Sequence, residues 1–295
     1  MRSLVVACFA AMLAGLGATS AAALEPLGDE ALSSTVGRDG VSFDVSNFKV
    51  SGNATLTYYE GAPGTGSLWF GNLYATRSDN TADPYGDPYQ LYTQTRPGLP
   101  DMLVLSNPVN ASGAERWQLA VDWGVNADGV NASNGTIMAS NMAIMGGGLQ
   151  IASPLAGATQ GIVWGYALGL NIGNLMFQPR GRDANGWTDP GAVAEQLNLA
   201  GVHVGAATSD GSNPTQPWVI ADATNQPGLL SIWDDPDGTP HLHVQIGWPT
   251  AGTQAPVGTI SVDNIAFQSD QTGNLNLGSG RIAGVQIQYM DIKFK

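Results

Sequence analysis

Two histidines and three aspartates lie close together near the C-terminal end of the sequence. His241 and His243 are separated by one residue, so a strand at this point would direct both imidazoles to the same face. Imidazole nitrogens and carboxylates are common ligands of transition metals, and Asp235 supplies a carboxylate nearby. The segment therefore has two interpretations. One is a metal site formed by His241, His243 and Asp235, and the other is a solvent-facing strand that follows an Asp-Pro-Asp-Gly turn.

A second polar segment has part of a calcium-loop pattern. Residues 126–131 read Asn-Ala-Asp-Gly-Val-Asn, but the first ligand position is Gly124 and no closing glutamate follows. This pattern favours an Asx-rich turn. Calcium also has candidate ligands in Asp79, Asp83 and Asp87. Apart from calcium, the sequence predicts no cofactor.

The residues that catalysis would need are sparse. Glutamate occurs only at 25, 30, 60, 115 and 195, the chain has three histidines, and no Gly-x-Ser-x-Gly motif is present. We therefore expect no enzymatic activity. The alternative is a glycan-active enzyme or carbohydrate-binding module in which Trp187 or Trp218 stacks on sugar rings.

Composition limits the partners and the class of protein. Eleven basic residues against 24 acidic ones give a net charge of -13, which argues against nucleic-acid binding because phosphate contacts need clustered Lys and Arg. A hydrophobic content of 43% is too high for an intrinsically disordered chain. We expect a folded protein.

The first 23 residues have the features of a secretory signal peptide. Arg2 supplies the positive charge, residues 4–16 are mostly apolar, and Ala21-Ala22-Ala23 is a small-residue cleavage site. The only cysteine, Cys8, lies in this segment. We therefore expect export and a mature chain that begins at Leu24 with no disulfide.

The elements that must position any site are predicted to be strands. Alternating apolar and polar residues are separated by Gly, Asn, Asp and Pro, which is typical of an all-β fold. One short helix is expected at 190–199, after a capping Asp189, and a loop or insertion at about 76–100. The predicted strands cover 41–45, 68–74, 102–105, 117–123, 161–177, 201–204, 229–233, 241–248, 259–267 and 282–294.

The recurring Gly and Asn residues favour a particular all-β architecture. Segments 64–75, 257–268 and 275–294 share a layout of Gly, a short alternating run and further apolar positions. This layout predicts a single domain over 41–295 built as a β-solenoid, like a parallel β-helix. A β-sandwich and an outer-membrane β-barrel are the alternatives.

The start of the expected mature chain resembles the opening of the FilA-type pilin family of Gram-negative bacteria. The matching positions include Leu24, Leu27, Leu32, Gly37 and Gly40, although Arg38 stands where the family has glutamine. The segments 258–265 and 282–287 are similar to the parallel β-helix ladders of that family. The resemblance implies a fimbrial or filament-associated surface protein without enzymatic activity.

The same opening residues also have a physical interpretation. Residues 24–40 would form a short capping element, because the open end of a solenoid exposes unpaired backbone and apolar core. From all these observations we expect an extracellular or outer-surface structural protein of a Gram-negative bacterium, active in adhesion or a biofilm matrix. Its expected partners are copies of itself or other fimbrial subunits, with the outer-membrane surface and glycans as further candidates.

Overall fold

The computed structural model describes residues 40–43, 48–59, 66–78, 88–127, 129–154, 161–179, 195–234, 238–269 and 273–294. All regular secondary structure in these ranges is β-strand, so the prediction of an all-β fold is confirmed. They contain no helix that could span a membrane. The expected signal peptide at 1–23, and the capping residues Leu24, Leu27, Leu32 and Gly37, lie outside the described residues.

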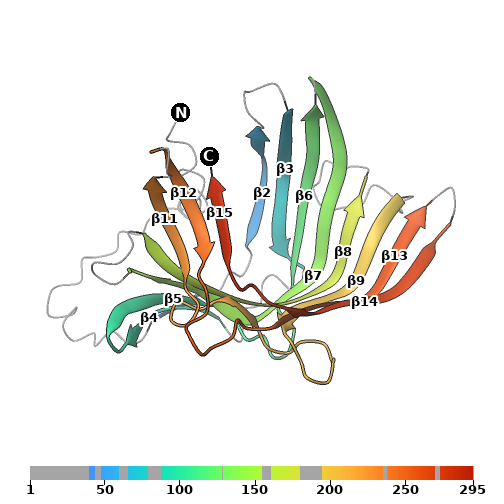
Figure 1. Ribbon diagram of the computed structural model, residues 1–295. Coiled ribbons are helices and arrows are strands. Elements are labelled where there is room, and N and C mark those ends of the chain that lie inside the picture. Colours follow the sequence, from blue (N-terminus) through green and yellow to red (C-terminus); the bar gives the residue numbers. More distant parts are fainter. Residues whose placement is uncertain are drawn as a thin grey trace, which may run out of the picture. The chain divides into compact units, whose positions relative to one another are not determined.

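The described strands form one large antiparallel sheet (Figure 1). Several of its neighbouring strands are consecutive in the chain, a connection that favours antiparallel pairing, as between β6 and β7. The strands are β1 (Val41–Phe43), β2 (Lys49–Tyr59), β3 (Gly66–Arg77), β4 (Tyr89–Arg96), β5 (Leu99–Ser106), β6 (Trp117–Ala127), β7 (Val130–Ala152), β8 (Ile162–Gln178), β9 (Glu195–Ala206), β10 (Trp218–Ala221), β11 (Gly228–Asp234), β12 (Pro240–Ile246), β13 (Gly258–Ser269), β14 (Leu275–Val285) and β15 (Met290–Phe294).

The sheet follows two paths that share β7 and β8. The first path has the order β2-β3-β6-β7-β8-β9-β13-β14, and the second has the order β1-β4-β5-β7-β8-β11-β12-β15. The short strand β10 also pairs with β8. In the described residues the two end strands of the first path, β2 and β14, each pair with one strand and not with each other. The first path is therefore open at both of its edges.

Three consecutive glycines let β7 pass from one path to the other. Gly146, Gly147 and Gly148 all have positive φ, and the register with β8 shifts between Ile144 and Gly147. Before these glycines β7 pairs with β6, and after them it pairs with β5. A Cβ on Gly147 would lie within 3 Å of the Ala167 carbonyl of β8, so only glycine fits here. The strand therefore bends at a bulge and keeps its pairing with β8.

A row of glycine and asparagine across the first path reverses the side-chain alternation. Asn141 and Gly201 have positive φ, and the register places Gly173 of β8 between them. On either side of this row, apolar residues of β8 that belong to one cluster are three positions apart, as in Ile172 and Leu175. Strict alternation would put such residues on opposite faces. The row therefore keeps the apolar side chains on a single face.

Two apolar clusters form the core of the described residues. The larger cluster has buried Ala139, Ile172 and Val202 at its centre, and all of its members come from the adjacent strands β6, β7, β8, β9 and β13. The smaller cluster joins Met102 and Val104 of β5, Ala152 of β7, and Ala223, which follows β10. The members of the larger cluster all lie on neighbouring strands of one path. Their side chains therefore pack mainly against side chains of the same path.

Three predictions from the sequence need correction. The parallel β-helix ladder is not what the described strands form, because every pair is antiparallel. The expected helix at 190–199 is strand from Glu195 onward, since pairing of β9 with both β8 and β13 overrides the local capping signal. The expected loop at about 76–100 contains the whole of β4, although 79–87 lie outside the described residues.

Candidate functional site

The predicted metal ligand His243 lies in a buried contact with an aspartate that the sequence analysis missed. His243 is on β12 with 4% of its side chain exposed, and its Nδ1 is 3.0 Å from Oδ1 of Asp291 on β15. Its ring stacks on Trp233 at a centroid distance of 4.1 Å. In the last predicted strand the alternation of apolar and polar residues is interrupted near Met290, just before Asp291. Only the pairing of β15 with β12 identifies Asp291 as the partner of His243.

The other two predicted ligands do not complete a metal site in the described residues. His241 is on the same strand, and its Nδ1 lies 3.1 Å from the carbonyl oxygen of Phe294. Asp235 lies outside the described residues. Within the described ranges no three His, Cys, Asp or Glu side chains come together as metal ligands. The metal site of His241, His243 and Asp235 therefore stays a prediction.

Ser231, His243 and Asp291 bring together the residue types of a nucleophile, a base and an orienting carboxylate. Ser231 is the register partner of His243, and both the Ser231 hydroxyl and His243 Nε2 are buried without a hydrogen-bond partner in the described residues. The hydroxyl and the ring nitrogen therefore do not form the hydrogen bond that would activate a nucleophile. With 3% of Ser231 exposed, this cluster is a part of the packed interior.

The candidate calcium segments fall in two places. Residues 126 and 131 are register partners at the end of β6 and the start of β7, and Gly129 has the positive φ of the tight turn between them. The Asx-rich turn is thus part of a β-hairpin, although Asp128 itself lies outside the described residues. Asp79, Asp83 and Asp87 also lie outside them.

The tryptophans proposed for sugar stacking do not form an exposed platform in the described residues. Trp218 is 7% exposed, donates a hydrogen bond to the Pro256 carbonyl at 3.1 Å, and covers Gly258. Trp187 lies outside the described residues. Sequence analysis missed the exposed aromatic pair, in which Trp248 stacks on Tyr289 with ring centroids 5.5 Å apart.

A hydrogen-bonded network connects polar side chains on three strands of the first path. The ring of His203 lies between Asn171 and Asp263, at 2.8 Å from the amide oxygen and 3.2 Å from the carboxylate. Asn213 donates to the other oxygen of Asp263 and accepts a hydrogen bond from the Ser261 hydroxyl. The contact with His203 holds the pKa of the Asp263 carboxyl below its usual range.

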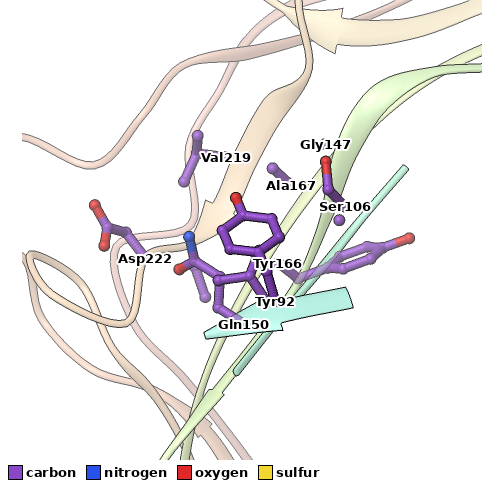
Figure 2. Close-up of a pocket in the computed structure, with 11 residues that line it drawn as sticks. Tyr92, Ser106, Gly147, Gln150, Tyr166, Ala167, Val219 and Asp222 are labelled. Atoms are coloured by element: carbon purple, nitrogen blue, oxygen red, sulfur yellow. The ribbon is translucent and has the colours of Figure 1, made fainter. Parts of the chain in front are cut away.

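A cavity of about 260 Å³ lies where β4, β5, β7, β8 and β10 meet (Figure 2). It adjoins the bend of β7 at Gly147 and Gly148. Its polar lining comes from Tyr92, Ser106, Gln150, Tyr166 and Asp222. Burial raises the pKa of the Tyr166 hydroxyl, so this group is in its neutral, hydrogen-bonding form. Sequence analysis gave no indication of the cavity, because the five strands are brought together by long-range pairing.

The two open edges of the first path are a further feature with functional potential. β2 and β14 contain 11 residues each, and neither contains proline. They carry exposed apolar side chains, among them Leu56 and Tyr58 on β2 and Leu275 and Leu277 on β14. About half of the backbone N–H and C=O groups of an edge strand point away from its partner. Among the described strands nothing pairs with these groups, so both edges have backbone groups that another strand can use.

Of the predicted capping residues, the structure describes only Gly40. It directly precedes β1, and a Cβ at this position would overlap the backbone of Leu91 and the side chain of Tyr92 on β4. Gly40 therefore allows a close approach between the start of β1 and β4.

Comparison of the chain with protein-family models, curated proteins and solved structures finds no match.

Proposed function

We propose that this protein is a structural subunit that joins copies of itself edge to edge into a filament or fimbria-associated assembly on the outer surface of a Gram-negative cell. The observation that carries the proposal is the pair of open edges, β2 and β14, at the two ends of one eight-strand path. Because the edges belong to different strands, contact between β2 of one copy and β14 of the next is head-to-tail and leaves a free edge for a further copy. The pilin-like opening sequence and the expected export signal agree with this role.

The charged residues of the two edges do not act as guards against strand pairing. Natural edge strands often carry lysine or proline that prevents docking of another chain. β2 has one charged residue, Lys49, whose ammonium group lies 5.3 Å from the ring centre of Tyr74 on the neighbouring strand. β14 has only Arg281, whose guanidinium donates to the carbonyls of Gly211 and Ser212. Both charges are directed toward their own chain.

Charged substitutions on the edges test this proposal. Leu275 and Leu277 are 57% and 56% exposed, so Leu275→Lys with Leu277→Lys removes little burial from the monomer and should change its stability by only about 0.5 kcal/mol per site. The double variant should abolish fibres that the wild-type exported chain forms, as seen by negative-stain microscopy and light scattering. Val109→Lys is the matched control, because Val109 is 63% exposed but lies outside the strands.

Mixing two blocked variants tests the polarity of the contact. A second variant, Leu56→Lys with Tyr58→Lys, blocks β2 and leaves β14 free. If β2 pairs with β14, an equimolar mixture of the two variants should form discrete 1:1 complexes, while each variant alone stays monomeric. Fibre formation by either variant alone would contradict the proposed contact.

A further inference from the structure

The cavity beside the bend of β7 has unused hydrogen-bonding capacity. The Tyr92 and Tyr166 hydroxyls line it, and neither has a hydrogen-bond partner in the part of the chain that the structure describes. Gln150 accepts a hydrogen bond from the Ala223 N–H with its Oε1, which leaves its Nε2 group to donate elsewhere. Two hydroxyls and an amide thus remain available to a molecule in the cavity.

The wall that carries Asp222 is held rigidly. The Asp222 carboxylate accepts hydrogen bonds from the Thr224 N–H and the Asn225 side chain, both at 2.7 Å, which fixes its orientation within a turn. Arg96, which is buried, donates to the carbonyl of the adjoining Ala223 at 3.0 Å and ties this turn to the end of β4. Figure 2 shows this carboxylate directed away from Tyr166 and Ala167, so Asp222 contributes a fixed wall of the cavity and its carboxylate does not face the ligand.

The lining selects a ligand class. Among the described residues of the lining, Asp222 is the only charged one and none is basic, so the cavity disfavours anions. The aromatic rings of Tyr92 and Tyr166 suit the C–H face of a ring, while the tyrosine hydroxyls and the Gln150 amide suit its hydroxyls (Figure 2). The volume of about 260 Å³ is slightly below the range of pockets for drug-sized ligands, which limits the occupant to a single ring.

We infer that this cavity binds one neutral sugar ring, as a free monosaccharide or as the end of a glycan chain. The site is separate from the open edges β2 and β14, so the inference goes beyond the proposed assembly and does not rest on it. It would give the assembled protein a means of attachment to glycans. The turn that holds Asp222 and the bend that holds Gly147 would both contribute to recognition.

Titration calorimetry and NMR with the full chain test the inference. The probes are the methyl glycosides of glucose, galactose, mannose and N-acetylglucosamine. Choline and gluconate are tested beside them as a cationic and an anionic ligand. We expect saturable binding of at least one glycoside, with wild-type NMR shifts at Tyr166 and at the side-chain amide of Gln150. Binding of choline alone, or of none of the glycosides, would overturn the inference.

Two substitutions locate the site. Tyr166→Phe removes one hydroxyl and keeps the ring, so affinity should fall about 3- to 10-fold, while Gln150→Leu removes the amide and should weaken binding about 10-fold. Tyr59→Phe is the matched control, since Tyr59 is exposed at the end of β2, a strand that does not line the cavity. If binding instead survives both substitutions and is lost in Trp248→Ala, the exposed aromatic pair is the site and the cavity inference is wrong. The wild-type NMR shifts decide the question even if a variant does not fold.

Discussion

Replacing Gly147 with alanine tests the bend through which β7 joins the two strand paths. Gly147 has a φ of +85°, and a Cβ there would lie within 3 Å of the Ala167 carbonyl. The left-handed conformation alone costs about 1–2 kcal/mol for alanine. Relief of the overlap requires β7 and β8 to separate, and each buried hydrogen bond left unpaired costs a further 1–3 kcal/mol, roughly. We therefore expect Gly147→Ala to lower the free energy of unfolding by at least about 3 kcal/mol.

Gly98→Ala is the matched control for this substitution. Gly98 lies in the β4–β5 turn with a φ of +74°, and no atom lies within 4 Å of the point that a Cβ would occupy, so only the conformational cost of about 1–2 kcal/mol applies. Urea unfolding should separate the two variants, and calorimetry should show Tm lowered by about 6–12 °C for Gly147→Ala. Equal destabilisation of the two variants would refute the close packing of β7 against β8 at the bend.

Three further predictions concern single side chains. Ile172→Ala should destabilise the chain by about 2–5 kcal/mol in urea unfolding, because Ile172 is a buried centre of the larger apolar cluster; a loss under 1 kcal/mol, roughly, would show that the cluster is not packed. The contact of Asp263 with His203 lowers the carboxyl pKa, so its stabilisation is present above the unfolded-state pKa and is lost as the pH falls through the folded-state value. NMR titration should show this lowered pKa, and a higher Asp263 pKa in a His203→Ala variant than in the wild type. An unchanged Asp263 pKa in the variant would contradict the contact. Because burial raises the pKa of Tyr166, its ring signals should titrate above pH 10, and titration at or below that value would place Tyr166 in open solvent.

Period-two alternation was a reliable signal where one strand has a uniform pattern. Six predicted segments lie within strands of the structure, with residue 161 as the single exception. These segments are 68–74, 102–105, 117–123, 161–177, 229–233 and 259–267. The long strand β7 was missed because its sequence through Gly146–Gly148 has no alternation, and its glycines indicated bends between elements. The structure shows a bend at these glycines, but the strand continues through it with its pairing to β8 intact.

Pairing between distant strands could not be predicted from the sequence. The segment 282–294 was expected as one strand, whereas β14 ends at Val285 and β15 begins at Met290, and these two strands pair with different partners. For the same reason the contact of His243 with Asp291 was not foreseen. Cavity residues Tyr92 and Tyr166 come from β4 and β8, which are brought near each other only through β5 and β7.

The most direct test of the proposed function is negative-stain microscopy of the chain from Leu24 to Lys295, with light scattering on the same samples across a range of concentrations. The account predicts regular fibres from the wild-type chain and from Val109→Lys, and discrete monomers from the variant with Leu275→Lys and Leu277→Lys on β14. A wild-type chain that stays monomeric at high concentration would contradict the proposed assembly. Fibres from the β14 variant, equal to those of the wild type, would show that the open edge is not the contact.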